Sequence, residues 1–280
     1  MNKVAILLST YNSKRYLREQ LDSLLAQTYA NWELYLHDDQ SDDDTCDMIN
    51  SYALKDPRIH LLKDTERRGS SGSFIWLLEH TEADFYMFCD HDDVWLPNKV
   101  EMTLEKMLSQ PDVDTTPLIV ACDAKVTNAV LDVTNPSFWH HCHTRQRYFS
   151  DRYYYLFYNN IPGCTMMLNS TAKQVSLPFR GTAFVHDSWI ISSVLWNKGR
   201  IETITQPLML YRLHESNLIG SQQSPSLLQQ VANVKKLLLK TRQRHLSAKV
   251  FVDMSFLRFL LMKTKYLLLF HCERFLDKIN

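Results

Sequence analysis

Glycine, proline and long apolar runs are scarce in this sequence. Its 280 residues include only 6 Gly and 9 Pro, too few for a collagen-like or low-complexity chain. No apolar stretch approaches the roughly 20 residues that a helix needs to span a bilayer. The first residues lead into a short apolar run with no cleavage site of a secretory signal. We therefore expect a globular, cytoplasmic protein.

Paired cysteine spacing is also absent. The six cysteines include no Cys-x-x-Cys pair, so we interpret them as reduced thiols. Residues 140–143, His-His-Cys-His, have the chemistry of zinc ligands. Adjacent side chains point in different directions, so we favour a polar surface loop over a zinc site.

The net charge is zero, but the charges are unevenly placed. Residues 221–280 hold eleven Lys and Arg against three Asp and Glu, which leaves an acidic body at residues 1–220. An acidic body argues against nucleic acid as a partner. We divide the chain into a main domain, residues 1–220, and a basic amphipathic helical extension, residues 221–280.

Short apolar runs alternate with helical patterns along the first hundred residues. The apolar runs, with two later ones, predict strands at residues 4–8, 33–36, 59–62, 84–89, 118–122 and 165–168. The periodic segments predict helices at residues 14–27, 43–54 and 73–79. This alternation predicts an α/β protein whose mostly parallel central sheet is flanked by helices.

Polar clusters follow three of these strands. Thr10, Tyr11 and Asn12 follow the first strand, Asp38 and Asp39 the second, and residues 90–93 the fourth. In such sheets, ligands bind outside the carboxyl ends of the strands. We therefore expect the three clusters to line one crevice.

Three carboxylates, Asp90, Asp92 and Asp93, lie within four residues. Like charges this close repel unless a cation compensates them, and oxygen ligands select Mg²⁺ or Mn²⁺. A solvated loop or a helix N-cap is the structural alternative. The buried strand before the cluster and Trp95-Leu96-Pro97 after it favour a metal site.

Several short motifs occur in a fixed order over residues 4–220. They are Ser9-Thr10-Tyr11-Asn12, Gln27-Thr28-Tyr29, Asp38-Asp39-Gln40-Ser41-Asp42 and Asp90-His91-Asp92-Asp93-Val94-Trp95-Leu96-Pro97. The ordered set resembles the family 2 glycosyltransferases, and the last motif is similar to bacterial rhamnosyltransferase-like members that build surface polysaccharides. The resemblance implies the GT-A fold, which is Rossmann-like.

The resemblance also implies a reaction and its substrates. A sugar, with rhamnose among the candidates, would move with inversion from a dTDP- or UDP-sugar to a glycan or lipid-linked glycan acceptor in O-antigen or capsule synthesis. A glycoside hydrolase with two carboxylates and an inactive scaffold of a polysaccharide assembly complex are the alternatives.

By the same resemblance, individual residues receive roles. The donor nucleotide would contact Thr10, Tyr11, Asn12, Asp39, Arg68, Asp90 and Arg212. Mn²⁺ or Mg²⁺ would be held by Asp92, Asp93 and His214, with the choice among the three neighbouring aspartates left open. The acceptor and sugar loop would include Trp95, Asn160 and Gly163. Helix capping is the alternative for Asp39, and we favour base binding.

Asp187 stands at the head of an apolar segment that is typical of a helix. An inverting transfer needs a group that takes the proton of the acceptor hydroxyl. Asp187 matches the family's acidic position, so we expect it to be the general base. A helix N-cap is the alternative.

Basic residues recur among leucines in the extension, at Lys235, Lys236, Lys240, Arg242, Arg244 and Lys249. We predict one helix from residue 226 and a second at residues 250–270. Three interpretations stay open: a peripheral contact with the inner face of the cell membrane, packing on the acidic body, and a homodimer contact.

Overall fold

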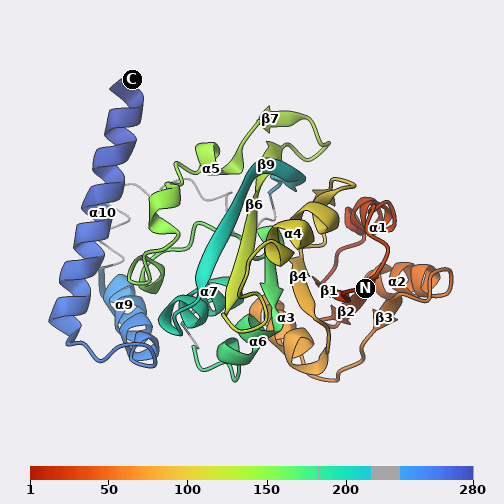
Figure 1. Cartoon of the computed structure of the whole chain (residues 1–280), viewed down its shortest axis with the longest axis horizontal. Coiled ribbons are helices and arrows are strands. Elements are labelled where there is room, and N and C mark those ends of the chain that lie inside the picture. The colour runs from red at the N-terminus through yellow and green to blue at the C-terminus, as the bar shows by residue number, and fades with distance from the viewer. Residues whose placement is uncertain (182, 216–233, 280) are drawn as a thin grey trace.

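A mixed sheet of nine strands crosses the protein, and helices pack against it (Figure 1). This computed structural model describes residues 1–181, 183–215 and 234–279. The strands are β1 (Val4–Thr10), β2 (Trp32–Asp38), β3 (Ile59–Leu61), β4 (Phe85–Cys89), β5 (Val94–Trp95), β6 (Leu118–Thr127), β7 (Val133–Asn135), β8 (Met166–Asn169) and β9 (Arg200–Arg212). The helices are α1 (Leu17–Leu25), α2 (Thr45–Ala53), α3 (Gly69–His80), α4 (Lys99–Leu108), α5 (Phe138–His141), α6 (Ser170–Ser176), α7 (His186–Trp196), α9 (Val234–Ala248) and α10 (Phe256–Ile279).

The strand order is β3-β2-β1-β4-β8-β6-β9-β5, and β7 pairs with β6. Parallel pairing joins β3, β2, β1 and β4, and it also joins β6 to β9. β8 runs antiparallel to both of its neighbours, β4 and β6. The six strands other than β8 in these pairs (β3, β2, β1, β4, β6 and β9) therefore all run in one direction. The α/β class is therefore confirmed, and each of the six predicted strands is present. The sequence did not predict β5, β7, β9 or α4.

Helices pack on the sheet along most of its width. α3 packs on β1 and β2 and contacts α7, which packs on β6 and β9. α4 packs on β6, β8 and β9. The end of α1 is linked to α4, because the side-chain oxygen of Gln27 accepts from the N–H of Val100 at 3.1 Å. β1 is buried along all seven residues. This burial explains why its sequence is a continuous apolar run rather than an alternating one.

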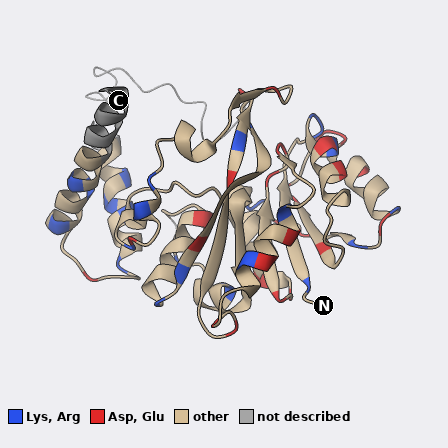
Figure 2. Ribbon diagram, turned by 45° about the horizontal axis from the view of Figure 1, so that its top comes forward, with Lys and Arg blue, Asp and Glu red and all other residues tan. Residues whose placement is uncertain are grey.

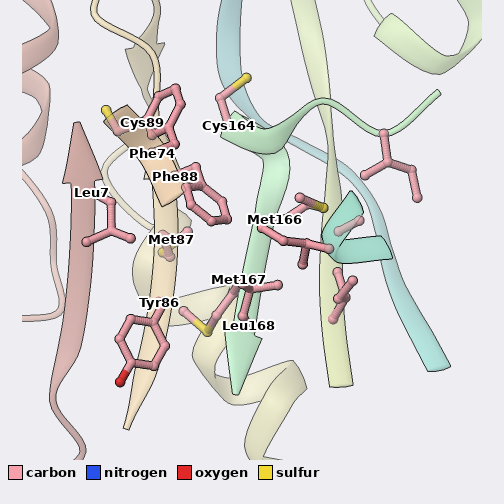
Figure 3. Close-up of a cluster of buried hydrophobic side chains, with 14 of the residues drawn as sticks. Leu7, Phe74, Tyr86, Met87, Phe88, Cys89, Cys164, Met166, Met167 and Leu168 are labelled. Carbon is pink, nitrogen blue, oxygen red and sulfur yellow. The ribbon is translucent and has the colours of Figure 1, made fainter. Parts of the chain in front are cut away.

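The pairing of β4 with β8 fixes the position of the chain segment that leads into β8 (Figure 3). Phe74 of α3 meets Phe88 of β4 edge to face, with ring centroids 5.6 Å apart. Because β8 is antiparallel to β4, the segment that leads into β8, including Cys164, lies beside the carboxyl end of β4. The chain segments after β4 and before β8 are thereby brought together.

The C-terminal helices α9 and α10 dock on the body through aromatic and polar contacts. Phe251 lies against Trp189 of α7, with ring centroids 4.9 Å apart. The hydroxyl of Tyr266 donates to Asp151 at 2.6 Å. The helices therefore pack on the body, which is one of the three interpretations of the extension. The proposed boundary at residue 220 and the expected helix start at residues 226–233 lie outside the described residues.

Within the described residues, no helix has both the length and the apolar character needed to cross a bilayer.

Arg244 is the main polar anchor of α9. Its guanidinium donates to the carbonyls of Tyr155, Leu156 and Ala183 at 2.8–3.2 Å and lies 3.5 Å from the ring centroid of Phe184. Burial lowers its pKa to about 10, which is still high enough to keep the charge at neutral pH.

We predict that Arg244→Met lowers the free energy of unfolding by about 2–4 kcal/mol, because three carbonyls lose their donor. Urea denaturation followed by circular dichroism measures the change. The matched control is Arg242→Met, an exposed arginine on the same helix, which should leave the transition within about 0.5 kcal/mol. Equal transitions for the two variants would contradict the anchoring role.

Candidate active site

The carboxyl ends of β2, β1 and β4 lie next to one another at one edge of the sheet. The pairing register places Thr10 beside Asp38, and Leu8 beside Cys89, which Asp90 follows. The three polar clusters that follow these strands in the sequence are thus adjacent in space. This is the edge at which ligands bind in open α/β sheets, so the predicted crevice would be formed here.

Asp38 and Asp39 both order the backbone around this crevice. Asp38 accepts from the hydroxyl of Thr10 at 2.7 Å and from the N–H of Ser41 at 2.8 Å. The buried Asp39 accepts from the N–H groups of Arg68 and Gly69 at 2.6 and 3.0 Å, where α3 begins. Asp39 therefore does perform the helix-capping role that was its alternative. Base binding by Asp39 stays a prediction.

Tyr11 and Arg67 form an exposed pair beside Asp39. The guanidinium of Arg67 lies 4.2 Å from the ring centroid of Tyr11, and its Nε lies 3.8 Å from an oxygen of Asp39. Tyr11 keeps 43% of its surface exposed, although the Arg67 guanidinium lies over its ring. The sequence singled out Arg68, but that side chain pairs with Asp64 and Glu66. Arg67 is the arginine that faces the predicted base pocket.

Asn12 ties the loops after β1 and β2 together. Its N–H donates to the hydroxyl of Ser41 at 2.9 Å, and its side-chain oxygen accepts from the N–H of Asp42 at 3.0 Å. Its φ of 48° places it in the left-handed region, which asparagine tolerates. The structure thus gives Asn12 a role in holding the loops after β1 and β2 together.

The acidic loop after β4 is divided into two groups of side chains. Asp90, Asp93 and Cys164 bring their potential ligand atoms within 4.8 Å of one another. Asp92 lies elsewhere in the loop, with one oxygen 2.8 Å from Nε2 of His214. The predicted metal set of Asp92, Asp93 and His214 therefore spans both groups.

Burial and mutual repulsion raise the pKa values of two of these carboxyls. Burial, followed by the charge of Asp92, raises the pKa of Asp90 to about 7. The same causes, in the same order, raise the pKa of Asp93 well above its usual range. One oxygen of Asp93 is buried and, among the described residues, has no hydrogen-bond partner. A divalent cation would compensate these charges and use that oxygen, so the residues fit Mg²⁺ or Mn²⁺.

Cys164 differs from its neighbours in charge. Burial, and then Asp90, raises the pKa of its thiol well above the usual range. Without a bound metal, the thiol therefore stays protonated at neutral pH and is not a nucleophile.

Lys99 is a buried cation below the acidic loop that the sequence did not single out. Its ammonium donates to the carbonyl of Cys164 at 2.5 Å and lies 3.9 Å from the ring centroid of Trp95. Trp95 is only 2% exposed, because β5 pairs with β9 and turns this ring into the core. The prediction that Trp95 lines the acceptor loop is therefore wrong. Its place two residues after Pro97, at the end of the acidic motif, was the available sequence signal for Lys99.

Arg212 holds the acidic loop in place. Its backbone N–H donates to Asp93 at 3.0 Å, and its Nε donates to the carbonyl of Asp92 at 2.7 Å. Its other guanidinium nitrogens donate to the carbonyl of Ala129 and to Glu19. The side chain is buried beneath the loop, so we replace its expected phosphate contact with this positioning role.

Asp187 lies in the first turn of α7 and is 4% exposed. A Cβ on Gly163 would lie 3.6 Å from the Cβ of Asp187, and the next residue, Cys164, groups with Asp90 and Asp93. Asp187 therefore lies on the side of the acidic loop, and after burial and Asp92 its charge adds to the raised pKa of Asp90. One of its oxygens accepts from the N–H of Ser188 at 2.6 Å. The structure therefore brings the expected base to the acidic loop.

Gly163 and Asn160 lie on the segment that leads into β8. A Cβ at Gly163 would lie 2.6 Å from Nε2 of His186 and 3.6 Å from the Cβ of Asp187, so this glycine permits close contact with α7. Both polar atoms of the Asn160 side chain are buried and lack a hydrogen-bond partner within the described part of the chain. Unpaired buried amides are costly, which favours a ligand contact at Asn160.

We predict a pH dependence of stability from the raised pKa of Asp90. Between about pH 4 and about pH 7, the folded chain keeps this proton while the unfolded chain has released it. With divalent metal removed by EDTA, the contribution of Asp90 to stability therefore falls across this window and levels off above it. Asp90→Asn, which stays neutral, should gain stability relative to wild type as the pH rises. Thermal unfolding across the window measures the difference, and a constant difference would contradict the raised pKa.

Comparison with known proteins places the chain in a family. The model of "Glycosyl transferase family 2" matches residues 5–175, more than half of the chain. The glucosyltransferase WfgD of Escherichia coli is 37% identical over 105 residues, which cover 38% of this chain and 41% of WfgD. WfaP of the same organism is 35% identical over 107 residues, 38% of this chain and 42% of WfaP. The chain thus spans about two fifths of the length of these curated relatives.

Solved structures share the architecture. Residues 1–349 of Staphylococcus aureus TarS, in complex with UDP-GlcNAc, align with a TM-score of 0.64 at 15% identity and cover 95% of this chain and 71% of that one. The mannosyltransferase PcManGT of Pyrobaculum calidifontis, with GDP-Man and Mn²⁺, gives 0.57 at 16% identity and covers 99% and 83%. At this identity the likeness shows the fold alone, and it confirms the GT-A-like architecture. With the family match over residues 5–175, these findings establish that the chain belongs to glycosyl transferase family 2.

Proposed function

We propose that this protein transfers a sugar from a nucleotide-diphosphate sugar to a hydroxyl group of a glycan or lipid-linked acceptor, with inversion at the anomeric carbon. The observation that carries the proposal is the position of Asp187. It lies at the start of α7, near Asp90 and the acidic loop at the end of β4. A proton acceptor and a site for a charged donor are thereby adjacent.

The nucleotide binds at the edge formed by the ends of β1 and β2. The exposed ring of Tyr11, with Arg67 over it, offers a stacking surface for the base. Asp39 offers a carboxylate to an N–H group of the base, and Thr10 and Asn12 fix the loops on either side. Asp90 lies beyond them, on the side of the ribose and diphosphate.

In this proposal Mn²⁺ or Mg²⁺ is held by Asp93, through its unpaired buried oxygen, together with Asp92 and His214. Carboxylate oxygen and imidazole nitrogen both suit Mn²⁺. The bound ion supplies a positive charge that stabilises the diphosphate leaving group. Arg212 and Lys99 keep the loop in position from below, through Asp92, Asp93 and Cys164.

Asp187 accepts the proton of the acceptor hydroxyl as that oxygen attacks the anomeric carbon. The bond from this carbon to the donor diphosphate breaks on the opposite face, and the nucleoside diphosphate leaves with the electron pair. No covalent sugar–enzyme intermediate is needed, which agrees with the protonated state of Cys164. Asn160 orients the acceptor or the donor sugar through its unpaired amide.

The substrate class is proposed from the relatives. WfgD is a β-1,3-glucosyltransferase that uses UDP-Glc and α-D-GlcNAc-diphosphoundecaprenol, and the TarS structure contains UDP-GlcNAc. We therefore propose a UDP- or dTDP-sugar donor, with rhamnose kept among the sugars, and an acceptor of bacterial surface polysaccharide synthesis at the cytoplasmic face of the membrane. Membership of the transferase family favours this function over glycoside hydrolysis.

We predict that Asp187→Asn lowers the turnover number for transfer by about 100- to 10,000-fold, because the amide cannot accept the proton. Donor binding should stay near the wild-type value. A panel of UDP- and dTDP-sugars with a lipid-diphosphate-linked acceptor measures transfer, and calorimetry with UDP and Mn²⁺ measures binding. The control is Asp114→Asn, an exposed aspartate remote from the site. Near-normal turnover in Asp187→Asn would show that another group is the base.

We predict that Asp92→Asn and His214→Gln each weaken Mn²⁺ binding by at least about 10-fold, because each removes a proposed ligand. Calorimetric titration of Mn²⁺ into the protein with UDP present measures the affinity. The control is the exposed His80→Gln, which should bind as wild type. If both ligand variants kept the wild-type affinity, the ion would have to bind at the Asp90–Asp93 group alone.

A further inference from the structure

The faces of α9 and α10 that point away from the body carry exposed leucines. On α10, Leu257, Leu261 and Leu268 are 68%, 63% and 59% exposed. Their spacing of four and seven residues places them on one stripe of the helix. On α9, Leu238 and Leu246 are also about half exposed and lie eight residues apart on one face. The two helices contact each other at one end of the molecule (Figure 1).

The opposite faces of both helices are already used for packing. His245 of α9 is buried and contacts the rings of Phe256 and Phe259. Tyr266 of α10 packs on Phe157 and donates to Asp151. The exposed leucines are therefore a second apolar face, additional to the one that the fold buries. Contiguous exposed apolar surface of this kind marks an interaction site.

Cations stand among these leucines on the same outward faces. Arg242 of α9, Lys249 just after α9, and Arg258 and Lys265 of α10 are all exposed. Residues 237–269 contain seven Lys and Arg but a single acidic residue, Asp253. Figure 2 shows this concentration of basic residues on the two helices. We call the set of exposed leucines and cations on α9 and α10 the outer face.

We propose that the outer face docks on an anionic lipid surface. Leucines enter the boundary between head groups and acyl chains, while the flanking Lys and Arg contact lipid phosphates. Each such cation contributes about 1 kcal/mol near an anionic surface. The pattern matches that of interfacial helices, in which a basic, polar set borders an apolar stripe.

A second copy of this chain fits the outer face less well. A two-fold interface places the same surface patch against itself. Over residues 237–269, the outer face would then bring its cations together with Asp253 as the single acidic residue to offset them. Anionic lipid, by contrast, is complementary to the whole face in charge and in apolar character.

The outer face is rigidly connected to the candidate active site. Arg244, on the inner side of α9, donates to the carbonyl of Ala183 at 2.8 Å and lies 3.4 Å from the hydroxyl of Ser188, the residue after Asp187. A docked outer face therefore holds Asp187 at a fixed distance from the lipid surface. This consequence rests on the proposed function, because it matters only if the acceptor is anchored in that surface.

Vesicle flotation of the full chain tests the proposal, with phosphatidylcholine vesicles and with vesicles that also contain phosphatidylglycerol. Wild type should float with the anionic vesicles, and added salt should release it. Leu257→Gln/Leu261→Gln/Leu268→Gln should weaken binding about tenfold or more. Arg258→Gln/Lys265→Gln should weaken it about fivefold for each cation removed.

Matched controls replace exposed residues elsewhere on the surface. Leu54→Gln/Leu108→Gln removes exposed leucines, and Lys55→Gln/Lys198→Gln removes exposed cations, so both should bind as wild type. UDP and Mn²⁺ binding, measured on each variant by thermal shift, reports the donor site separately. Binding to vesicles without binding of UDP would contradict the proposed function but would still support the docking proposal.

Three outcomes overturn the docking proposal. The first is wild type that fails to float with anionic vesicles while it still binds UDP. The second is equal binding to both kinds of vesicle. The third is a wild-type dimer that the triple leucine variant converts to a monomer without any change in flotation, which would assign the outer face to a second copy.

Discussion

Two carboxylates with raised pKa values, Asp90 and Asp93, stand side by side at the end of β4, and their repulsion must be balanced. Burying like charges is costly, so the fold surrounds them with compensating groups. The backbone N–H of Arg212 reaches Asp93 from β9, and Lys99 lies below on α4. These groups come from segments more than a hundred residues apart, so the acidic loop also helps to hold the end of β9 against the end of β4.

A single divalent cation would balance the negative charges of both carboxylates. Their raised pKa values favour the protonated forms of the two carboxyls when no metal is bound. In the proposed function, a divalent ion would replace these protons and compensate the charge of the carboxylates. Asp187 is close enough to influence Asp90, yet it belongs to another element, α7. In the proposed function, neighbouring groups on different elements would therefore stabilise the leaving group and remove the proton of the acceptor.

Most of the first hundred residues could be assigned from the sequence because their signals are local. The apolar runs at β1, β2 and β4 and the polar residues that follow them are short-range patterns, and parallel strands necessarily present their ends at one edge. β9 was missed, although it is 13 residues long, because Pro207 interrupts it and its pairing with β6 shifts register near that point. Trp95 was misplaced because its burial depends on β9, which the sequence did not reveal.

The sequence by itself determined the α/β class, the order of the strand-end clusters and the identity of the acidic loop. Each of these follows from patterns within a few residues, because the spacing of apolar residues indicates helices and strands and the clusters of charged residues are visible in the sequence. Only the tertiary structure decided that Arg67 rather than Arg68 faces Tyr11, that Arg212 holds the loop from below, and that the basic extension packs by one face and exposes another. Those choices depend on the direction of each side chain and on contacts between distant segments, which are set when the whole chain packs.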